Sequence, residues 1–122
     1  MAILNGGDPF VADCVFHHNA NTGHTIDIDL GGFGTFDHLT VVDNPHNGLH
    51  MQRGSTCRIE NSIFARNAGR GICDFLAGAI NTPTLRNCLF WQNTISLIHV
   101  QGVEMHTIAA VNALSYASGN VS

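Results

Sequence analysis

The sequence predicts an all-β solenoid, in which similar coils stack on one another, and three observations support this prediction. A seven-residue phrase that ends in asparagine recurs along the chain, at 13–19, 38–44, 61–67, 87–93 and 106–112. The closing asparagines are 25, 23, 26 and 19 residues apart, a period typical of solenoids. A glycine and an apolar residue follow the asparagine at matching distances in Gly48-Leu49 and Gly71-Ile72. Helical spacing is absent over any useful length, and short runs alternate apolar and polar residues as strands do.

The elements are expected in coil order along the chain. Residues 2–4 form a short strand, and 5–9 form a turn because they combine Asn, Gly and Pro. About five coils follow, at 11–33, 35–55, 57–81, 82–102 and a short last one at 103–122. The strand at 72–76 is less regular, and a bulge near Asp74 is expected to turn Phe75 inward. The chain is therefore predicted to be a single domain, 1–122, either whole or cut from a longer solenoid.

Stacked coils place equivalent residues above one another, because parallel strands lie about 4.8 Å apart. One predicted interior column is largely apolar and contains Phe16, Val41, Phe64, Phe90 and Ala109. A second predicted column is a ladder of Asn19, Asn44, Asn67, Asn93 and Asn112. An asparagine amide has donors and an acceptor, so it can bond both turn backbone and the asparagines above and below it.

Composition argues against several classes of partner. Charged residues make up 11% of the chain, lysine is absent, and the net charge is -4. The five arginines are outnumbered by nine acidic residues and give no basic cluster to neutralise phosphates, so nucleic acid is not expected to bind. No apolar run approaches the roughly 20 residues that a membrane span needs, and no signal peptide is visible at the N-terminus.

The four cysteines are expected to be free thiols. Cys14 and Cys88 hold equivalent repeat positions with two repeats between them, so they cannot meet in a stack. No C-x-x-C pair occurs, which argues against a zinc knuckle. Buried small thiols are the preferred interpretation, and Cys73 is expected to be the accessible one.

The phrases Asn-Cys-Leu-Phe-Trp-Gln-Asn and Asn-Ser-Ile-Phe-Ala-Arg-Asn, each followed shortly by Gly-Ile or a similar pair, resemble the right-handed parallel β-helix of the pectate-lyase-like superfamily. The resemblance covers about residues 5–117 and implies that fold, with an Asn ladder. It implies an extracellular or cell-surface location and a link to polysaccharides. It does not choose an activity, because the superfamily includes lyases, hydrolases, epimerases, adhesins and phage tailspikes.

In this superfamily the polysaccharide site usually lies on the outer face of the strand that follows the ladder. On this chain that face is predicted to carry a first row of Thr25, His50, Cys73 and His99. A second row contains Asp27, Gln52 and Gln101, with Asp29 beyond it and Asp74 added if the bulge turns it outward. His50, His99 and Asp27 are the candidates for acid–base catalysis. The predicted ligand-binding set consists of Asp27, Asp29, His50, Gln52, Cys73, His99 and Gln101.

Two other interpretations of the same face remain open. The residues are also what a half-exposed strand ordinarily presents to solvent. A column of His50, Cys73 and His99 could also bind a soft divalent metal, although no metal and no cofactor is predicted.

Two classes of function follow from this reading. The first is a binding or structural module of unknown, carbohydrate-related ligand. The second is an enzyme, a lyase or epimerase, acting on acidic glycans. The first is preferred because neither the clustered aspartates of polygalacturonases nor the calcium ligands and catalytic base of the lyases are complete here.

The ends of the stack raise a separate expectation. No capping helix can be drawn at either end, and bare strand edges pair with other chains. A homo-oligomer is therefore expected, joined through a coil end or a flat β-face.

Overall fold

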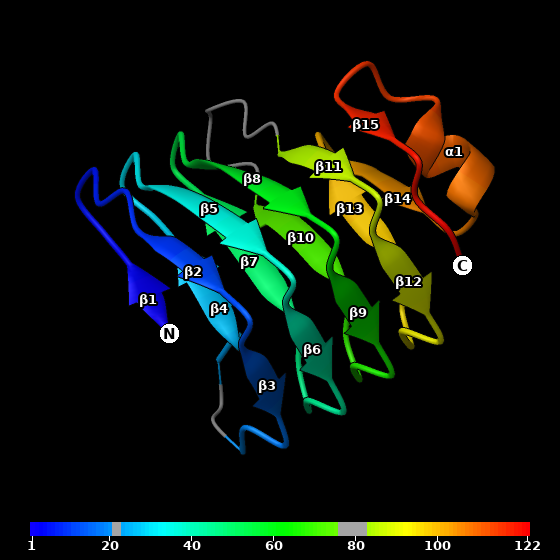
Figure 1. Ribbon diagram of the computed structural model, residues 1–122, viewed down its shortest axis with the longest axis horizontal. Helices are drawn as coiled ribbons and strands as arrows, with labels where there is room; N and C mark the ends of the chain where they lie inside the picture. The colour runs from blue at the N-terminus through cyan, green and yellow to red at the C-terminus, as the bar shows by residue number, and fades with distance from the viewer. Residues whose placement is uncertain (21–22, 76–82) are drawn as a thin grey trace.

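The computed structural model describes residues 1–20, 23–75 and 83–122, and it confirms the predicted fold class. Short parallel strands stack as a β-solenoid of about four turns, with three sheets running along the stack (Figure 1). Each full coil contributes one strand to each sheet in turn. The coils at 35–55 and 57–81 show this most plainly, because their strands pair on both sides.

The sheet that follows the asparagines, called sheet A here, has six strands. In spatial order they are β1 (Ala2–Ile3), β4 (Ile26–Ile28), β7 (Leu49–Gln52), β10 (Ile72–Phe75), β13 (Ile98–Val100) and β14 (Val103–Met105). All neighbours are parallel except β13 and β14, which form an antiparallel pair.

The other two sheets, B and C, complete each coil. Sheet B contains β2 (Phe10–Ala12), β5 (Phe33–Asp37), β8 (Thr56–Glu60), β11 (Thr84–Arg86) and β15 (Ala117–Ser118). Sheet C contains β3 (Val15–His17), β6 (Thr40–Val42), β9 (Ile63–Ala65) and β12 (Leu89–Trp91). All pairs within these two sheets are parallel.

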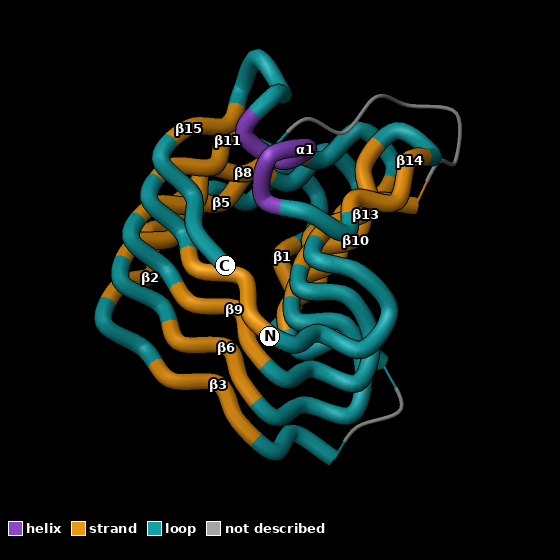
Figure 2. Tube along the Cα trace, turned by 90° about the vertical axis from the view of Figure 1, so that its right-hand side faces the viewer, coloured by secondary structure: helices purple, strands orange, loops and turns teal. Residues whose placement is uncertain are grey.

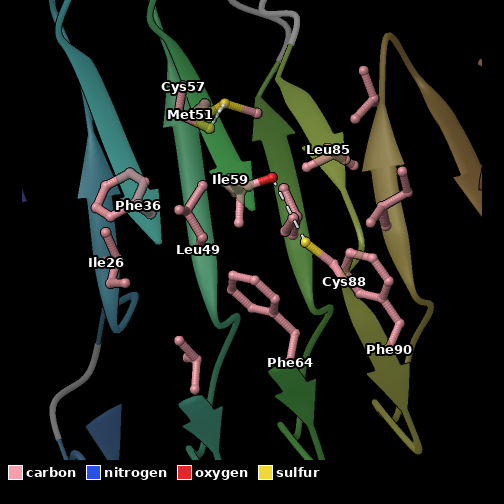
Figure 3. Packing of buried hydrophobic residues seen from close by; sticks show 14 of the residues in the cluster. Ile26, Phe36, Leu49, Met51, Cys57, Ile59, Phe64, Leu85, Cys88 and Phe90 are labelled. Atoms are coloured by element: carbon pink, nitrogen blue, oxygen red, sulfur yellow. Dashed lines mark hydrogen bonds between the residues drawn. The ribbon is translucent and has the colours of Figure 1, made fainter. Parts of the chain in front are cut away.

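The core is a set of columns, one side chain per coil. Val41, Phe64 and Phe90 pair in register and are fully buried, and Phe64 stacks on Phe90 with ring centroids 5.7 Å apart. Figure 3 shows these rings beside the aliphatic side chains of sheets A and B. Phe16 packs against the core while remaining partly exposed in the first coil. The predicted interior column is thus confirmed for its first four members.

The described corners of the coils repeat the same backbone conformation. After β1, β4, β7 and β13, a residue with positive φ precedes a glycine with positive φ, as in a type I′ turn. The pairs are Asn5-Gly6, Leu30-Gly31, Arg53-Gly54 and Gln101-Gly102. Single left-handed residues mark the other two corners, at Asp13, His38, Asn61 and Asn87, and at His18, Asp43, Arg66 and Gln92. Glycine suits the second position of the paired corners because it adopts positive φ without steric cost.

The asparagine ladder is confirmed over four rungs. Nδ2 of Asn19 donates to Oδ1 of Asn44, Asn44 to Asn67, and Asn67 to Asn93, with distances of 2.9–3.0 Å. Each upper amide oxygen also accepts the backbone N–H of the asparagine below it. The ladder therefore closes one corner of the stack with bonds that run between coils.

The last segment differs from the predicted fifth coil. Residues 108–112 form the helix α1 (Ile108–Asn112), so Ala109 is exposed rather than interior and Asn112 is not a rung. Asn112 instead exchanges hydrogen bonds with Asn120. The coil resumes after the helix for part of a turn, where β15 extends sheet B and Val121 bridges Leu89 of sheet C.

Helix α1 also corrects the expectation that neither end has a capping helix. It lies over the C-terminal end of the stack (Figure 2), and Val111 is fully buried there. Thr107 caps its N-terminus by accepting a hydrogen bond from the backbone N–H of Ala110.

No helix in the described part of the chain is long and apolar enough to span a membrane.

Candidate functional site

The outer face of sheet A carries a row of polar side chains in register, here called the sheet A row: Asp27, His50, Cys73 and His99. Three of the four were predicted in one row, but Asp27 replaces Thr25 at its start. Ile26 pairs with Leu49, so coil one has two more residues than coil two between its ladder asparagine and its strand. Thr25 is consequently buried at the strand entrance.

His50 forms the centre of the first half of the row. Its Nδ1 lies 2.9 Å from Oδ1 of Asp27, and its ring stacks on His24 with centroids 3.8 Å apart. Only 8% of the His50 side chain is exposed, against 31% for Asp27. Burial lowers the pKa of His24, and the neighbouring His50 lowers it further. A His–Asp pair of this geometry is chemically suited to proton transfer, although a ligand reaches Asp27 more easily than the imidazole.

The second half of the row contains Cys73 and His99. Sγ of Cys73 lies 4.0 Å from Nδ1 of His99 and donates to the backbone carbonyl of Asp74. Burial raises the pKa of the Cys73 thiol to about 11, so the thiol is protonated near neutral pH. The expectation that Cys73 is the accessible cysteine is wrong, because it is buried whereas Cys14 is partly exposed. A protonated, buried thiol is a poor nucleophile.

Asp74 supports His99 from within the coil. Register pairs it with Met51 through four consecutive residues of β10, so the predicted bulge is absent and Asp74 is buried. Its Oδ1 lies 3.2 Å from Nδ1 of His99 without a hydrogen-bond donor among the described residues, and its Oδ2 accepts the backbone N–H of Gln101. The prediction for the Phe75 side chain lies outside the described residues.

The remaining predicted residues divide between structure and surface. Asp29 is buried and holds Arg53 through two hydrogen bonds, which lower the pKa of the carboxyl group. Asp29 therefore stabilises the corner at Arg53, and its carboxylate is already engaged there rather than available to a ligand. Gln52 is half-buried at the end of β7, and Gln101 is exposed at the corner after β13.

The prediction missed Glu104, because it reaches the face from the antiparallel strand β14. Glu104 pairs with His99 in register, and both Arg70 and Ser96 donate hydrogen bonds to its carboxylate. These donors lower the pKa of Glu104, with Arg70 as the largest cause. A repeat-based alignment cannot find such a residue, since β14 lies outside the parallel stack.

Every arginine in the chain has a carboxylate partner. The five pairs are Arg53–Asp29, Arg58–Glu60, Arg66–Asp43, Arg70–Glu104 and Arg86–Glu60. Within residues 1–20, 23–75 and 83–122, no group of three His, Cys, Asp or Glu side chains is arranged to hold a metal ion.

The stacked coils, Asn ladder and repeated corners define a parallel β-solenoid repeat protein. A family model described as "Right handed beta helix region" matches residues 1–116, and the chain belongs to that family. The resemblance to the pectate-lyase-like superfamily holds at this level of fold. No match is found among curated proteins or among solved structures.

Proposed function

We propose that the protein is a β-helix binding module whose outer sheet A face binds a carbohydrate chain that carries no charge. The observation behind this proposal is the sheet A row itself. Asp27 is held by His50, and His99 lies against Asp74. These side chains therefore lose little conformational entropy when a ligand binds. Parallel strands repeat every ~4.8 Å, so a linear polymer laid across them would pass one side chain of the row in each successive coil.

The preference for an uncharged glycan follows from the arginines. A uronate carries a carboxylate that a binding site must neutralise, and the five arginines are already paired with this chain's own carboxylates. The net charge of -4 would further repel a polyanion. Neutral hydroxyls need only hydrogen-bond partners, which Asp27, His99 and Gln101 can supply.

The second candidate function is a lyase or epimerase acting on acidic glycans. The contact between His50 and Asp27 at 2.9 Å favours it, because a general base needs an oriented imidazole. The protonated Cys73 thiol and the burial of His50 beneath His24 favour binding instead.

Calorimetry with neutral β-linked oligosaccharides and with oligogalacturonates tests the proposal. His99 is the side chain to change, because it is partly exposed whereas His50 is buried. His99→Ala is expected to weaken binding of the neutral oligosaccharide about tenfold. Gln92→Ala, at an exposed corner residue, is the matched control and should leave affinity unchanged.

Two results would count against the proposal. If no neutral oligosaccharide gives a heat of binding, the proposed binding function is rejected. Ultraviolet absorbance from unsaturated uronates, formed by the native chain and lost in His99→Ala, would establish the enzyme instead.

A further inference from the structure

A surface hollow of about 440 Å³ lies at the corner between sheets C and A, apart from the sheet A row. In Figure 1 this corner is formed by the loops that follow β3, β6 and β9. Its lining residues come from three successive coils: His18, Ala20, Asp43, Asn44, Pro45, Arg66 and Ala68. The volume falls in the range of roughly 300–1,000 Å³ that small-molecule sites occupy.

One wall of the hollow is a polar column. His18, Asp43 and Arg66 each precede a ladder asparagine, and each has the positive φ of its corner. Arg66 donates to Asp43 through Nε and Nη2, both at 2.7 Å. This pairing lowers the pKa of Asp43, and His18 and His17 nearby act in the same direction.

The other wall is a small apolar column. Ala20, Pro45 and Ala68 each follow a ladder asparagine, and all three are exposed. The buried amides of Asn44 and Asn67, bonded to each other, fix the spacing between the two columns. An open hollow with one apolar side and one hydrogen-bonding side is thus formed by three consecutive coils.

We infer that this hollow is a second ligand site, and that it binds an uncharged pyranose ring with adjacent hydroxyl groups. The C–H face of such a ring fits against methyl and prolyl carbons. The Asp43–Arg66 pair can bond adjacent hydroxyls, because a guanidinium has five N–H donors and a carboxylate about four acceptor sites, of which the pair itself uses only two each.

The charge of the hollow selects against anions. The charges of Asp43 and Arg66 cancel each other, so this ion pair offers a carboxylated sugar no excess positive charge. The Arg66 side chain is 52% exposed and that of Asp43 is 30% exposed, so both are within reach of a ligand.

The experiment is a nuclear magnetic resonance titration of backbone amides with neutral disaccharides, cellobiose and maltose among them, and with digalacturonate. Neutral disaccharides are expected to shift the amides of Ala20, Asn44 and Ala68. Ala68→Leu should reduce the affinity at least tenfold, because the added side chain fills the hollow without entering the core. Thr94→Leu is the matched control: Thr94 is exposed and follows ladder residue Asn93 one coil further on, outside the hollow.

Asp43→Asn gives a second and independent readout. The variant keeps the shape of the wall but leaves the charge of Arg66 uncompensated. Binding of neutral disaccharides should weaken about tenfold, while digalacturonate should bind more tightly than it does to the native chain.

Three outcomes overturn the inference. The first is that no neutral disaccharide shifts these amides, and the second is that Ala68→Leu and Thr94→Leu weaken binding equally. The third is that shifts fall only on Asp27, His99 and Gln101, which would reject the hollow while supporting the proposed sheet A function. Shifts at the hollow alone would do the reverse.

Discussion

Asn67 lies inside the ladder, and its side-chain amide forms hydrogen bonds to the coils on both sides. Its Nδ2 donates to the Val41 carbonyl and to Asn93, and its Oδ1 accepts from the backbone N–H and the amide of Asn44. The residue is fully buried, so none of these partners can turn to water instead. Asn19, at the start of the ladder, is partly exposed, and among the described residues its side chain donates to Asn44.

Replacing Asn67 with alanine is therefore expected to lower the free energy of unfolding by about 1–3 kcal/mol, since buried partners lose their bonds. Asn19→Ala should cost less, because water can replace what it loses. Urea titration of both variants measures the difference. Equal losses at the two positions would show that the ladder does not act as a stack.

The shifted pKa values of one histidine and three carboxyl groups predict that the free energy of unfolding falls in two steps as the pH is lowered. The pKa of His24 is lowered from 6.5 in the fold, so the unfolded chain binds the proton first and stability falls as the pH drops below about 6.5. The pKa values of Asp29, Asp43 and Glu104 are lowered mainly by hydrogen bonds from their arginines. The stability that these groups contribute is present above the ordinary carboxyl pKa, and it is lost as the pH falls from there through their lowered pKa values.

Melting temperature measured from pH 8 to pH 3 checks this expectation. Two descending regions should appear, and His24→Gln should remove only the upper one. A flat profile between pH 7 and pH 5 in the native chain would contradict the role given to His24.

Residues on the regular repeat could be predicted from the sequence, and those off it could not. The first four rungs and the outward set of His50, Cys73 and His99 follow from the period alone. The sequence placed Thr25 beside His50, whereas the structure places Asp27 there, two residues later. The reason is that the loop before β4 is two residues longer than the loop before β7. Arg66 and Asp43 are 23 residues apart in the sequence. Their ion pair can be predicted only when the register of the coils is known and the charges of neighbouring coils are compared.

The helix α1 was not predicted from the sequence. A five-residue helix is too short to show a helical period, and its residues resemble the ladder phrase closely enough to extend the repeat. Its stability comes from packing on the last coil rather than from propensity. The fold class was predictable because it rests on many coils, whereas the cap depends on one local contact.

Val111 makes that contact, and Val111→Ala is expected to cost about 2 kcal/mol through lost burial and the cavity left behind. Ala109→Ser, on the exposed side of the same helix, should change stability little. Thermal unfolding of the two variants compares the burial of the two faces. A loss at Ala109 as large as at Val111 would mean that the helix does not pack as a cap.

At the scale of the whole molecule, the two ends of the stack differ. The C-terminal end carries α1, whereas β1, β2 and β3 each pair with a strand on one side only. Four of the nine exposed large apolar side chains in the described ranges lie in residues 1–17, which carry these three strands and form the first coil of the stack: Met1, Leu4, Phe10 and Val15. Open edges of this kind pair readily with other chains.

We propose that the 122-residue chain forms a two-fold dimer through this first coil, burying more than about 1,000 Å² in total. Sedimentation equilibrium should give twice the 13.1 kDa of the monomer at tens of micromolar. Phe10→Lys should return the mass to that of the monomer, because a charge at an exposed edge opposes pairing. Val103→Lys, exposed near the capped end, is the control; a dimer lost equally in both variants would place the contact elsewhere.

The direction of the bonds between coils has a mechanical consequence. The sheet hydrogen bonds and the asparagine ladder both run along the stack, so tension on the two chain ends would load one coil boundary at a time. Each coil that peels away would release 23–26 residues, or ~80 Å of extended chain. In the 122-residue chain the first coil has a neighbour on one side only, and the last is secured beneath α1, so extension of this chain would begin at the first coil. Under force the protein would lengthen in regular steps whose size records the repeat.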